Sequence, residues 1–242
     1  MLYVLIGIGL LITALAFILT EKNAPVLLSG YNTMSKEEQA NYPLGDFLKL
    51  YKRFHLVLGL SMIVLGIALR AVWGDNAMGL VLALYPLLGY LYFMFRVQQL
   101  APQQNSSGMK IGVGVLIFTT LLVMVMLWMG FKPIEVVLQE DHLALKGMYG
   151  KTIPLSEVVA VSIEDHLPEI QYKTNGYAMG KIAKGYFKTV DGEKVRLLVD
   201  EESERYVCIT SKDGIRTFLG QTHSQADELY AQLVNHIEVE GR

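Results

Sequence analysis

The chain has 242 residues, of which 52% are hydrophobic and only 18% are charged, with a mean hydropathy of +0.35. Soluble globular chains carry about 25% charged residues, so this composition indicates a membrane part joined to a soluble part. Residues 1–132 hold 9 Lys and Arg against 5 Asp and Glu, whereas residues 133–242 hold 12 against 18. The acidic C-terminal part argues against nucleic acid as a partner.

Four apolar stretches lie in residues 1–132, and each has the length of a transmembrane helix. They cover about residues 2–20, 55–73, 77–95 and 111–131, and none contains Asp or Glu. Residues 2–20 also have features of a signal peptide, with Ala14-Leu15-Ala16 resembling a cleavage site, but no Lys or Arg precedes the run and we expect it to be retained. Gly74-Asp75-Asn76 is so short a turn that the third stretch must return antiparallel to the second. We therefore predict a four-span transmembrane domain, which without embedded carboxylates is a poor transporter by itself.

The loop of residues 21–54, between the first two spans, contains the sequence GYNTMSKEEQANY from Gly30 to Tyr42. Ser35 followed by Glu38 is typical of a capping box, and the helix that starts there should end before Pro43. The first nine residues, which we call the signature loop, have two interpretations: a cap that fixes the path of the chain, or a docking motif for a partner. The candidate docking residues are Gly30, Tyr31, Asn32, Thr33, Met34, Ser35, Lys36, Glu37 and Glu38.

The distribution of Lys and Arg predicts an orientation. The 21–54 loop and the linker of residues 96–110 hold 7 Lys and Arg on one side, whereas Arg70 and Lys132 lie near the membrane on the other. The positive-inside rule then places both loops in the cytoplasm and residues 133–242 outside it, in a multi-pass membrane protein.

From Pro133 onward the pattern changes to short alternating runs, which predict seven or eight antiparallel strands and no βαβ unit. Glu140-Asp141, Asp191-Gly192 and Lys212-Asp213-Gly214 are expected hairpin turns, and Asn175-Gly176 is a further expected turn. A helix over residues 224–238 closes the chain. The helix has an apolar stripe that must dock on the sheet. The residues of this stripe are Ala226, Leu229, Tyr230, Leu233 and Ile237. We predict a bent antiparallel sheet, a partly open barrel, plugged by that helix.

Two resemblances follow from these residues. The run KGMYGKTIPLSEVVAVSIEDHLPEI, the later runs TNGYAMGKIAKGYFKTVDGEKVRLLVD and YVCITSKDGIRTF, and the terminal helix together resemble the bacterial pleckstrin-homology-like (PH-like) domain over about Pro133–Glu238. GYNTMSKEE with its flanking apolar spans is similar to the hallmark of a family of uncharacterised bacterial membrane proteins, over Met1 to about Phe95. Neither resemblance implies catalytic residues. Pleckstrin domains that bind phosphoinositides use basic first loops, and here that hairpin carries Glu140-Asp141-His142.

The sequence contains no recognisable catalytic, cofactor or metal motif. The five histidines are scattered, Cys208 is the only cysteine, and there is no GxSxG, Walker A or GxGxxG pattern in a fitting context. We expect a protein that is not an enzyme, has no cofactor, and displays its PH-like domain at the membrane surface as a scaffold or accessory subunit. Its partners would be the lipid bilayer and either another protein or further copies of itself. The alternatives are a subunit of a membrane transport or enzyme complex, and a lipid-sensing module.

Overall fold

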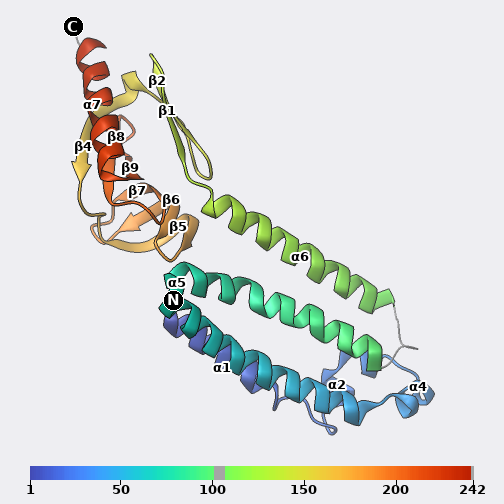
Figure 1. The fold of residues 1–242 in the computed structure, drawn as a ribbon. Coiled ribbons are helices and arrows are strands. Elements are labelled where there is room, and N and C mark those ends of the chain that lie inside the picture. The colour runs from blue at the N-terminus through green and yellow to red at the C-terminus, as the bar shows by residue number, and fades with distance from the viewer. Residues whose placement is uncertain (101–106, 241–242) are drawn as a thin grey trace. The chain divides into compact units, whose positions relative to one another are not determined.

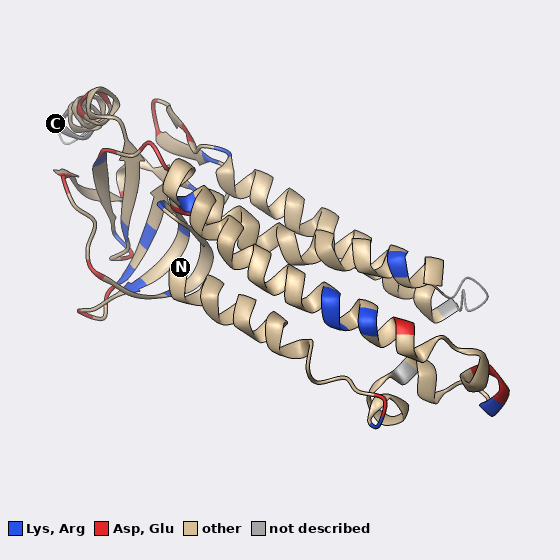
Figure 2. Cartoon of the chain, turned by 60° about the horizontal axis from the view of Figure 1, so that its bottom comes forward, with Lys and Arg blue, Asp and Glu red and all other residues tan. Residues whose placement is uncertain are grey.

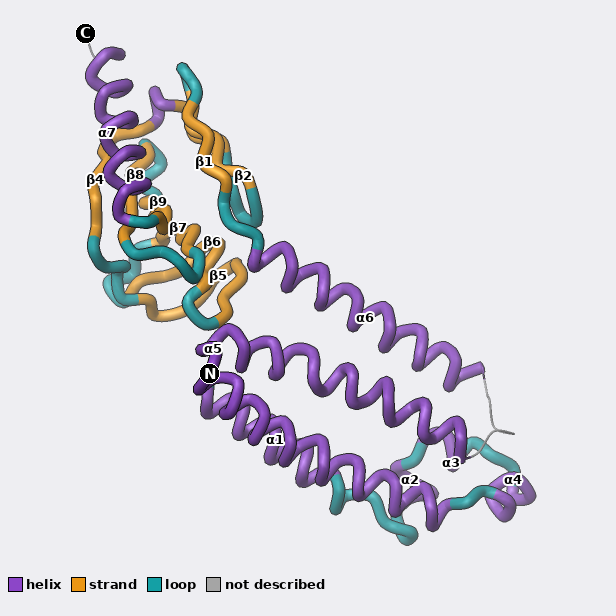
Figure 3. The backbone as a smooth tube through the Cα atoms, in the orientation of Figure 1, coloured by secondary structure: helices purple, strands orange, loops and turns teal. Residues whose placement is uncertain are grey.

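The computed structural model describes residues 1–100 and 107–240, and the chain divides into two compact units, Met1–Met124 and Val125–Arg242 (Figure 1). The first unit is helical and all the strands belong to the second, as the colouring of Figure 3 shows. Part of the expected 96–110 linker, including Pro102, lies outside the described residues.

The first unit begins with the apolar helix α1 (Leu2–Leu15) and three short helices, α2 (Ala24–Leu27), α3 (Ser29–Asn32) and α4 (Lys36–Asn41). Its main element is α5 (Leu44–Leu100), whose backbone leaves the helical region at Gly74, with φ 80° and ψ −170°. We call residues 44–73 the first arm of α5 and residues 75–100 the second arm. Figure 1 shows α5 turning back on itself there, so the predicted reversal at Gly74-Asp75-Asn76 is confirmed.

Polar and aromatic side chains join the two arms of α5. The Tyr90 hydroxyl lies 3.1 Å from His55 Nε2, and the Tyr85 hydroxyl lies 2.8 Å from Ser61 Oγ. The rings of Phe54 and Phe93 stack with their centroids 4.5 Å apart. The tyrosines that the sequence places in the third apolar stretch therefore face the other arm and satisfy its polar groups, as buried hydroxyls require.

Two helices are long and apolar enough to cross a membrane, Leu44–Leu100 and Gly108–Phe131, whereas Leu2–Leu15 is a shorter apolar helix. The expected spans 55–73 and 77–95 lie in the two arms of α5, on either side of the break at Gly74. The expected first span of residues 2–20 extends beyond α1, which ends at Leu15. The chain turns after Leu15, and Asn23 holds that turn through hydrogen bonds with the Thr20 N–H and the Ile18 carbonyl, both 2.7 Å. Figure 2 shows long stretches of α5 and α6 (Ser107–Phe131) without charged residues.

The second unit contains two sheets and a closing helix. The first sheet has the order β1-β2-β3, and the second has the order β4-β8-β9-β7-β6-β5. A 3-10 turn (Leu155–Glu157) links the two sheets, and α7 (His223–Glu240) follows the last strand. The strand bounds are β1 Glu135–Leu138, β2 His142–Lys146, β3 Thr152–Pro154, β4 Val158–Glu164, β5 Ile170–Met179, β6 Ile182–Thr189, β7 Lys194–Val199, β8 Arg205–Ser211 and β9 Arg216–Gln221.

The central strands β7, β8 and β9 of the six-stranded sheet are largely buried on both faces. Leu198, Val207 and Leu219 lie in the core that also holds Ala226, Leu229 and Leu233 of α7. The opposite face holds a second core around Phe187, Val195, Leu197, Cys208 and Phe218. The predicted docking of the helix stripe is therefore confirmed for those three α7 residues, with Tyr230 partly buried; the Ile237 side chain lies outside the described residues. The second unit is therefore a β-sheet domain capped by the helix α7.

Two details of the sheet differ from the expectations. The strands are not all antiparallel, because β9 enters between β7 and β8 and runs parallel to β7, with Val195 opposite Arg216. Asn175-Gly176 is not a turn but lies inside β5, where Asn175 pairs with Tyr186 and Gly176 with Gly185. The register of β5 shifts between Lys173 and Asn175, and the strand continues through this irregularity without reversing the chain. The described part of the second unit has nine strands.

Side chains of β5, β6 and the residue that follows β7 hold the junction between α6 and the β domain. Lys184 Nζ, fully buried, donates to the Lys132 carbonyl oxygen at 2.6 Å and lies 2.6 Å from Asp200 Oδ1. Asp200 Oδ2 accepts a hydrogen bond from the Ile134 N–H at 3.3 Å. On the neighbouring strand the Tyr177 ring lies directly over Gly130, where a Cβ atom would come 2.4 Å from Tyr177 Cζ. The last turn of α6 and the first residues after it are therefore fixed to the β5–β6 hairpin.

Candidate functional site

The signature loop begins the helix α4 with the predicted capping box. Ser35 is the N-cap, its Oγ accepts a hydrogen bond from the Glu38 N–H at 3.3 Å, and Glu38 Oε2 accepts one from the Ser35 N–H at 2.7 Å. The hydrogen bond from the Ser35 backbone lowers the pKa of the Glu38 carboxyl. The helix ends at Asn41, before Pro43, as predicted. This part of the signature loop therefore has a structural role.

The signature loop is also packed against the helices of its own unit. Gln39 Nε2 donates to the carbonyl oxygens of Tyr31, at 3.0 Å, and Met34, at 3.2 Å. The Tyr31 ring lies 5.5 Å from that of Tyr42, which is 6.0 Å from Phe47 on α5. Burial raises the pKa of Tyr42 to about 12. A continuous row of aromatic rings therefore connects the signature loop to the bundle.

Other side chains of the signature loop are turned to the surface. Asn32, Lys36 and Glu37 are exposed, and Figure 2 shows the charged residues of α4 at the end of the helical unit. The sequence interpretation of all nine residues as a docking motif therefore stays a prediction. Tyr31, Ser35 and Glu38 are accounted for by the fold.

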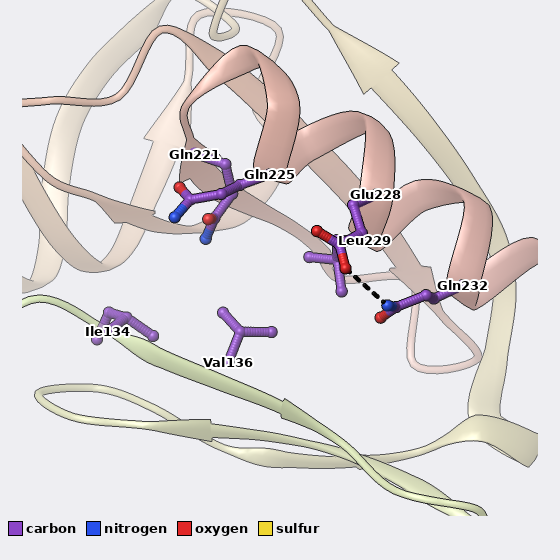
Figure 4. A pocket seen from close by; sticks show the side chains of 7 residues that line it. All are labelled: Ile134, Val136, Gln221, Gln225, Glu228, Leu229 and Gln232. Carbon is purple, nitrogen blue, oxygen red and sulfur yellow. Dashed lines mark hydrogen bonds between the residues drawn. The ribbon is translucent and has the colours of Figure 1, made fainter.

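A groove that the sequence did not reveal lies between β1 and α7 (Figure 4). One part of it has a volume of about 270 Å³, and its lining residues are Ile134, Val136, Gln221, Gln225, Glu228, Leu229 and Gln232. The other part has a volume of about 420 Å³ and is lined by Leu138, Gln232, Asn235 and His236. Because Gln232 lines both parts, we treat them as one feature, the β1–α7 groove.

The β1–α7 groove combines an apolar wall with a carboxamide rim. Ile134, Val136 and Leu138 alternate along the strand, so their side chains share one face, and in Figure 4 the first two point toward α7. Facing them, the glutamine side chains of α7 offer N–H donors and carbonyl acceptors, and Gln232 Nε2 donates to Glu228 Oε1 at 3.2 Å. β1 is also the edge strand of its sheet, so one side of its backbone is unpaired in the described structure.

These features suit an extended polypeptide segment, which needs main-chain partners along one edge and pockets for alternate side chains. The sequence did not reveal the groove because β1 and α7, which form its two sides, are about 90 residues apart in the chain. One signal was present: Gln225, Glu228 and Gln232 recur at helical spacing beside the apolar stripe. That pattern alone is equally typical of a solvated helix face. Among the described residues, no three His, Cys, Asp or Glu side chains gather into a metal site.

The chain belongs to the class of proteins in which an apolar helical region precedes a β domain closed by a C-terminal helix. Residues 5–101 match the family model described as a domain of unknown function, DUF3784, and residues 134–230 match the model described as a bacterial PH domain. Both resemblances stated from the sequence are thereby confirmed: a DUF3784 domain in the N-terminal half and a bacterial PH domain in the C-terminal part. Comparisons with curated proteins and with solved structures find no match for this chain.

Proposed function

We propose that the chain is an integral membrane protein that crosses the bilayer four times, through α1, the two arms of α5, and α6. Each arm of α5 exceeds the roughly 20 residues that span a bilayer. Large apolar side chains remain exposed along these helices, as a lipid-facing surface requires, and they include Val57, Leu60, Val64, Ile111, Val115, Phe118 and Leu121. After α1 the apolar run continues through Phe17 and Ile18, both exposed, which lengthens the first crossing.

The orientation we propose has the signature loop in the cytoplasm and the bacterial PH domain outside it. The support is the excess of Lys and Arg, 7 against 2, on the side of the 21–54 and 96–110 segments. A reporter that is active only in the cytoplasm, fused after Arg242, should be inactive. The same reporter placed in the signature loop should be active, and the reverse pattern would overturn this orientation.

The function we propose is that of a non-catalytic interaction module held at the membrane, a scaffold or accessory subunit of a membrane assembly. The single observation that carries it is the β1–α7 groove, with its apolar wall, carboxamide rim and free strand edge. The groove would hold an extended segment of a partner protein, adding it to the edge of β1. The bacterial PH domain is the recognising part, and the helical part keeps it at the membrane.

A photo-crosslinking amino acid at Gln232, in the middle of the groove, tests this function in cells. We expect a crosslinked product of one defined mass, absent when Asn235→Trp fills the adjoining part of the groove. The same amino acid at Lys212, in the exposed β8–β9 turn, is the matched control and should give no such product. Equal products from both positions, or a product that persists in Asn235→Trp, would contradict the proposal. The mass also distinguishes a partner protein from a second copy of the chain.

A further inference from the structure

The end of α6 fixes the depth of the β5–β6 hairpin relative to a membrane. The apolar helix runs from Gly108 to Phe131, so Gly130 is its last residue but one. The Tyr177 ring lies directly on Gly130, and its strand neighbour Lys184 donates to the Lys132 carbonyl oxygen. If α6 spans the bilayer, as the proposed function requires, Tyr177 lies where hydrocarbon meets headgroups.

The residues around this junction have the chemistry of a membrane interface. Lys132 Nζ lies 5.8 Å from the ring centroid of Trp128, and Trp and Tyr with a nearby Lys are typical of the boundary between hydrocarbon and water. At the tip of the hairpin, Met179 is half-buried, and Lys181 is exposed. An apolar body with a cation at its end lets a side chain reach into the headgroup layer while its charge stays hydrated.

A second loop flanks the same junction. Lys146 pairs with Glu135, so the loop of residues 147–150 begins beside Ile134, close behind the end of α6. This loop contains Met148 and Tyr149, both half-buried, and the Tyr149 hydroxyl donates to Asn175 Oδ1 at 3.0 Å. That bond ties the loop to β5. The two loops therefore lie around the exit of α6, one on each of the two sheets.

We propose that the β5–β6 tip (Ala178–Lys181) and the 147–150 loop, together the interfacial loops, enter the headgroup layer of the membrane that α6 crosses. Their partner is the lipid surface itself. Lys151 and Lys181 would meet lipid phosphates, and the Met and Tyr side chains would lie among the glycerol groups. Glu201, Glu202 and Glu204 follow β7 at the same end of the sheet, so the contact is to zwitterionic lipid and not selective for anionic headgroups.

The test uses the full chain with Cys208→Ala, reconstituted in phosphatidylcholine vesicles and labelled with an environment-sensitive fluorophore at one new cysteine. Lys181→Cys probes the hairpin tip. Asp191→Cys is the control, because it lies in the exposed turn at the far end of β6, about 26 Å away for 8 residues at about 3.3 Å each. Ile117→Cys, exposed on α6, reports whether that helix is in the bilayer. Lipids spin-labelled at the headgroup or mid-chain act as quenchers.

Headgroup spin labels should quench the fluorophore at residue 181 and shift its emission to shorter wavelength, leaving the one at residue 191 unchanged. Mid-chain spin labels should quench the fluorophore at residue 117. Quenching at residue 117 with no difference between residues 181 and 191 would overturn the interfacial loops alone. Absence of quenching at residue 117 would overturn the proposed membrane span, and with it the depth assigned to the hairpin.

Discussion

Lys184 and Asp200 form an ion pair at the point where the apolar helix passes into the β domain. Lys184 Nζ lies 2.6 Å from Asp200 Oδ1, and the lysine side chain is fully buried while the aspartate side chain is 23% exposed. The same two side chains hold the Lys132 carbonyl and the Ile134 N–H. This ion pair thus supplies hydrogen-bond partners for two backbone groups of the segment between α6 and β1.

Replacing either partner should strongly destabilise the β domain. Lys184→Met leaves an unpaired carbonyl and a carboxylate whose Oδ1 is buried, and Asp200→Asn leaves a buried ammonium, so each should lower the free energy of unfolding by about 3–5 kcal/mol. The double variant should lose less free energy of unfolding than the two single variants together, since it leaves neither charge without its partner. Thermal unfolding of the full chain in detergent measures all three.

An exposed pair of the same domain is the matched control for this prediction. Lys146 Nζ lies 3.3 Å from Glu135 Oε1, with side chains 60% and 66% exposed. Lys146→Met should change the free energy of unfolding by no more than about 1 kcal/mol. If the two lysine substitutions had equal effects, burial would not be what makes the Lys184–Asp200 pair important.

In the signature loop, the two residues for which a capping role is conceivable should behave differently. Ser35→Ala removes the N-cap side chain of α4 and should lower the stability of that helix by about 0.5–2 kcal/mol. Asn32 is exposed at the end of α3 and forms no side-chain cap in the structure, so Asn32→Ala should leave stability unchanged. Hydrogen exchange of the α4 amides is the measurement. Loss in Asn32→Ala of a protein that co-purifies with the parent chain, with unchanged exchange, would support the docking interpretation.

The pH dependence of that cap follows from Glu38. Its pKa in the folded chain is lowered from the ordinary value of 4.5 by the Ser35 backbone hydrogen bond. A lowered folded-state pKa contributes stability above the unfolded value, and this contribution is lost as the pH falls through the folded pKa. Glu38→Gln should therefore increase α4 exchange at pH 7, and its difference from the parent chain should disappear as the pH falls through the lowered pKa of Glu38. Glu37→Gln, next to it but outside the capping box, should show no such convergence.

The sequence predicted those features that depend on near neighbours along the chain. The capping box, the turns at Asp191-Gly192 and Lys212-Asp213-Gly214, and the docking stripe of α7 each follow from residues within about two helical turns. The insertion of β9 beside β7 and the β1–α7 groove depend on pairings between distant segments, which alternation of apolar residues does not specify. The sequence gives no signal for the buried Lys184, because its partners Asp200 and Lys132 are remote from it along the chain.

Gly74 should tolerate no side chain. Its φ of 80° with ψ of −170° belongs to a region that essentially only glycine occupies, and the reversal of α5 depends on it. Gly74→Ala should destabilise the helical unit by about 1–3 kcal/mol. Gly45→Ala, in the first turn of α5 where an added Cβ meets nothing within 4 Å, should be neutral or slightly stabilising. Thermal unfolding in detergent compares them, and equal midpoints would show that the bend does not need glycine.

Cys208 should be unreactive until the β domain unfolds. It lies on β8 with 3% of its surface exposed, in the core around Phe187 and Phe218. Burial raises the pKa of its thiol, so little of the nucleophilic thiolate forms near neutral pH, and reagents also lack access to it. A maleimide should therefore label the native chain slowly and the chain in denaturant completely, as measured by intact mass. Rapid labelling of the native chain would show that β8 separates from its neighbours under native conditions and would contradict this prediction.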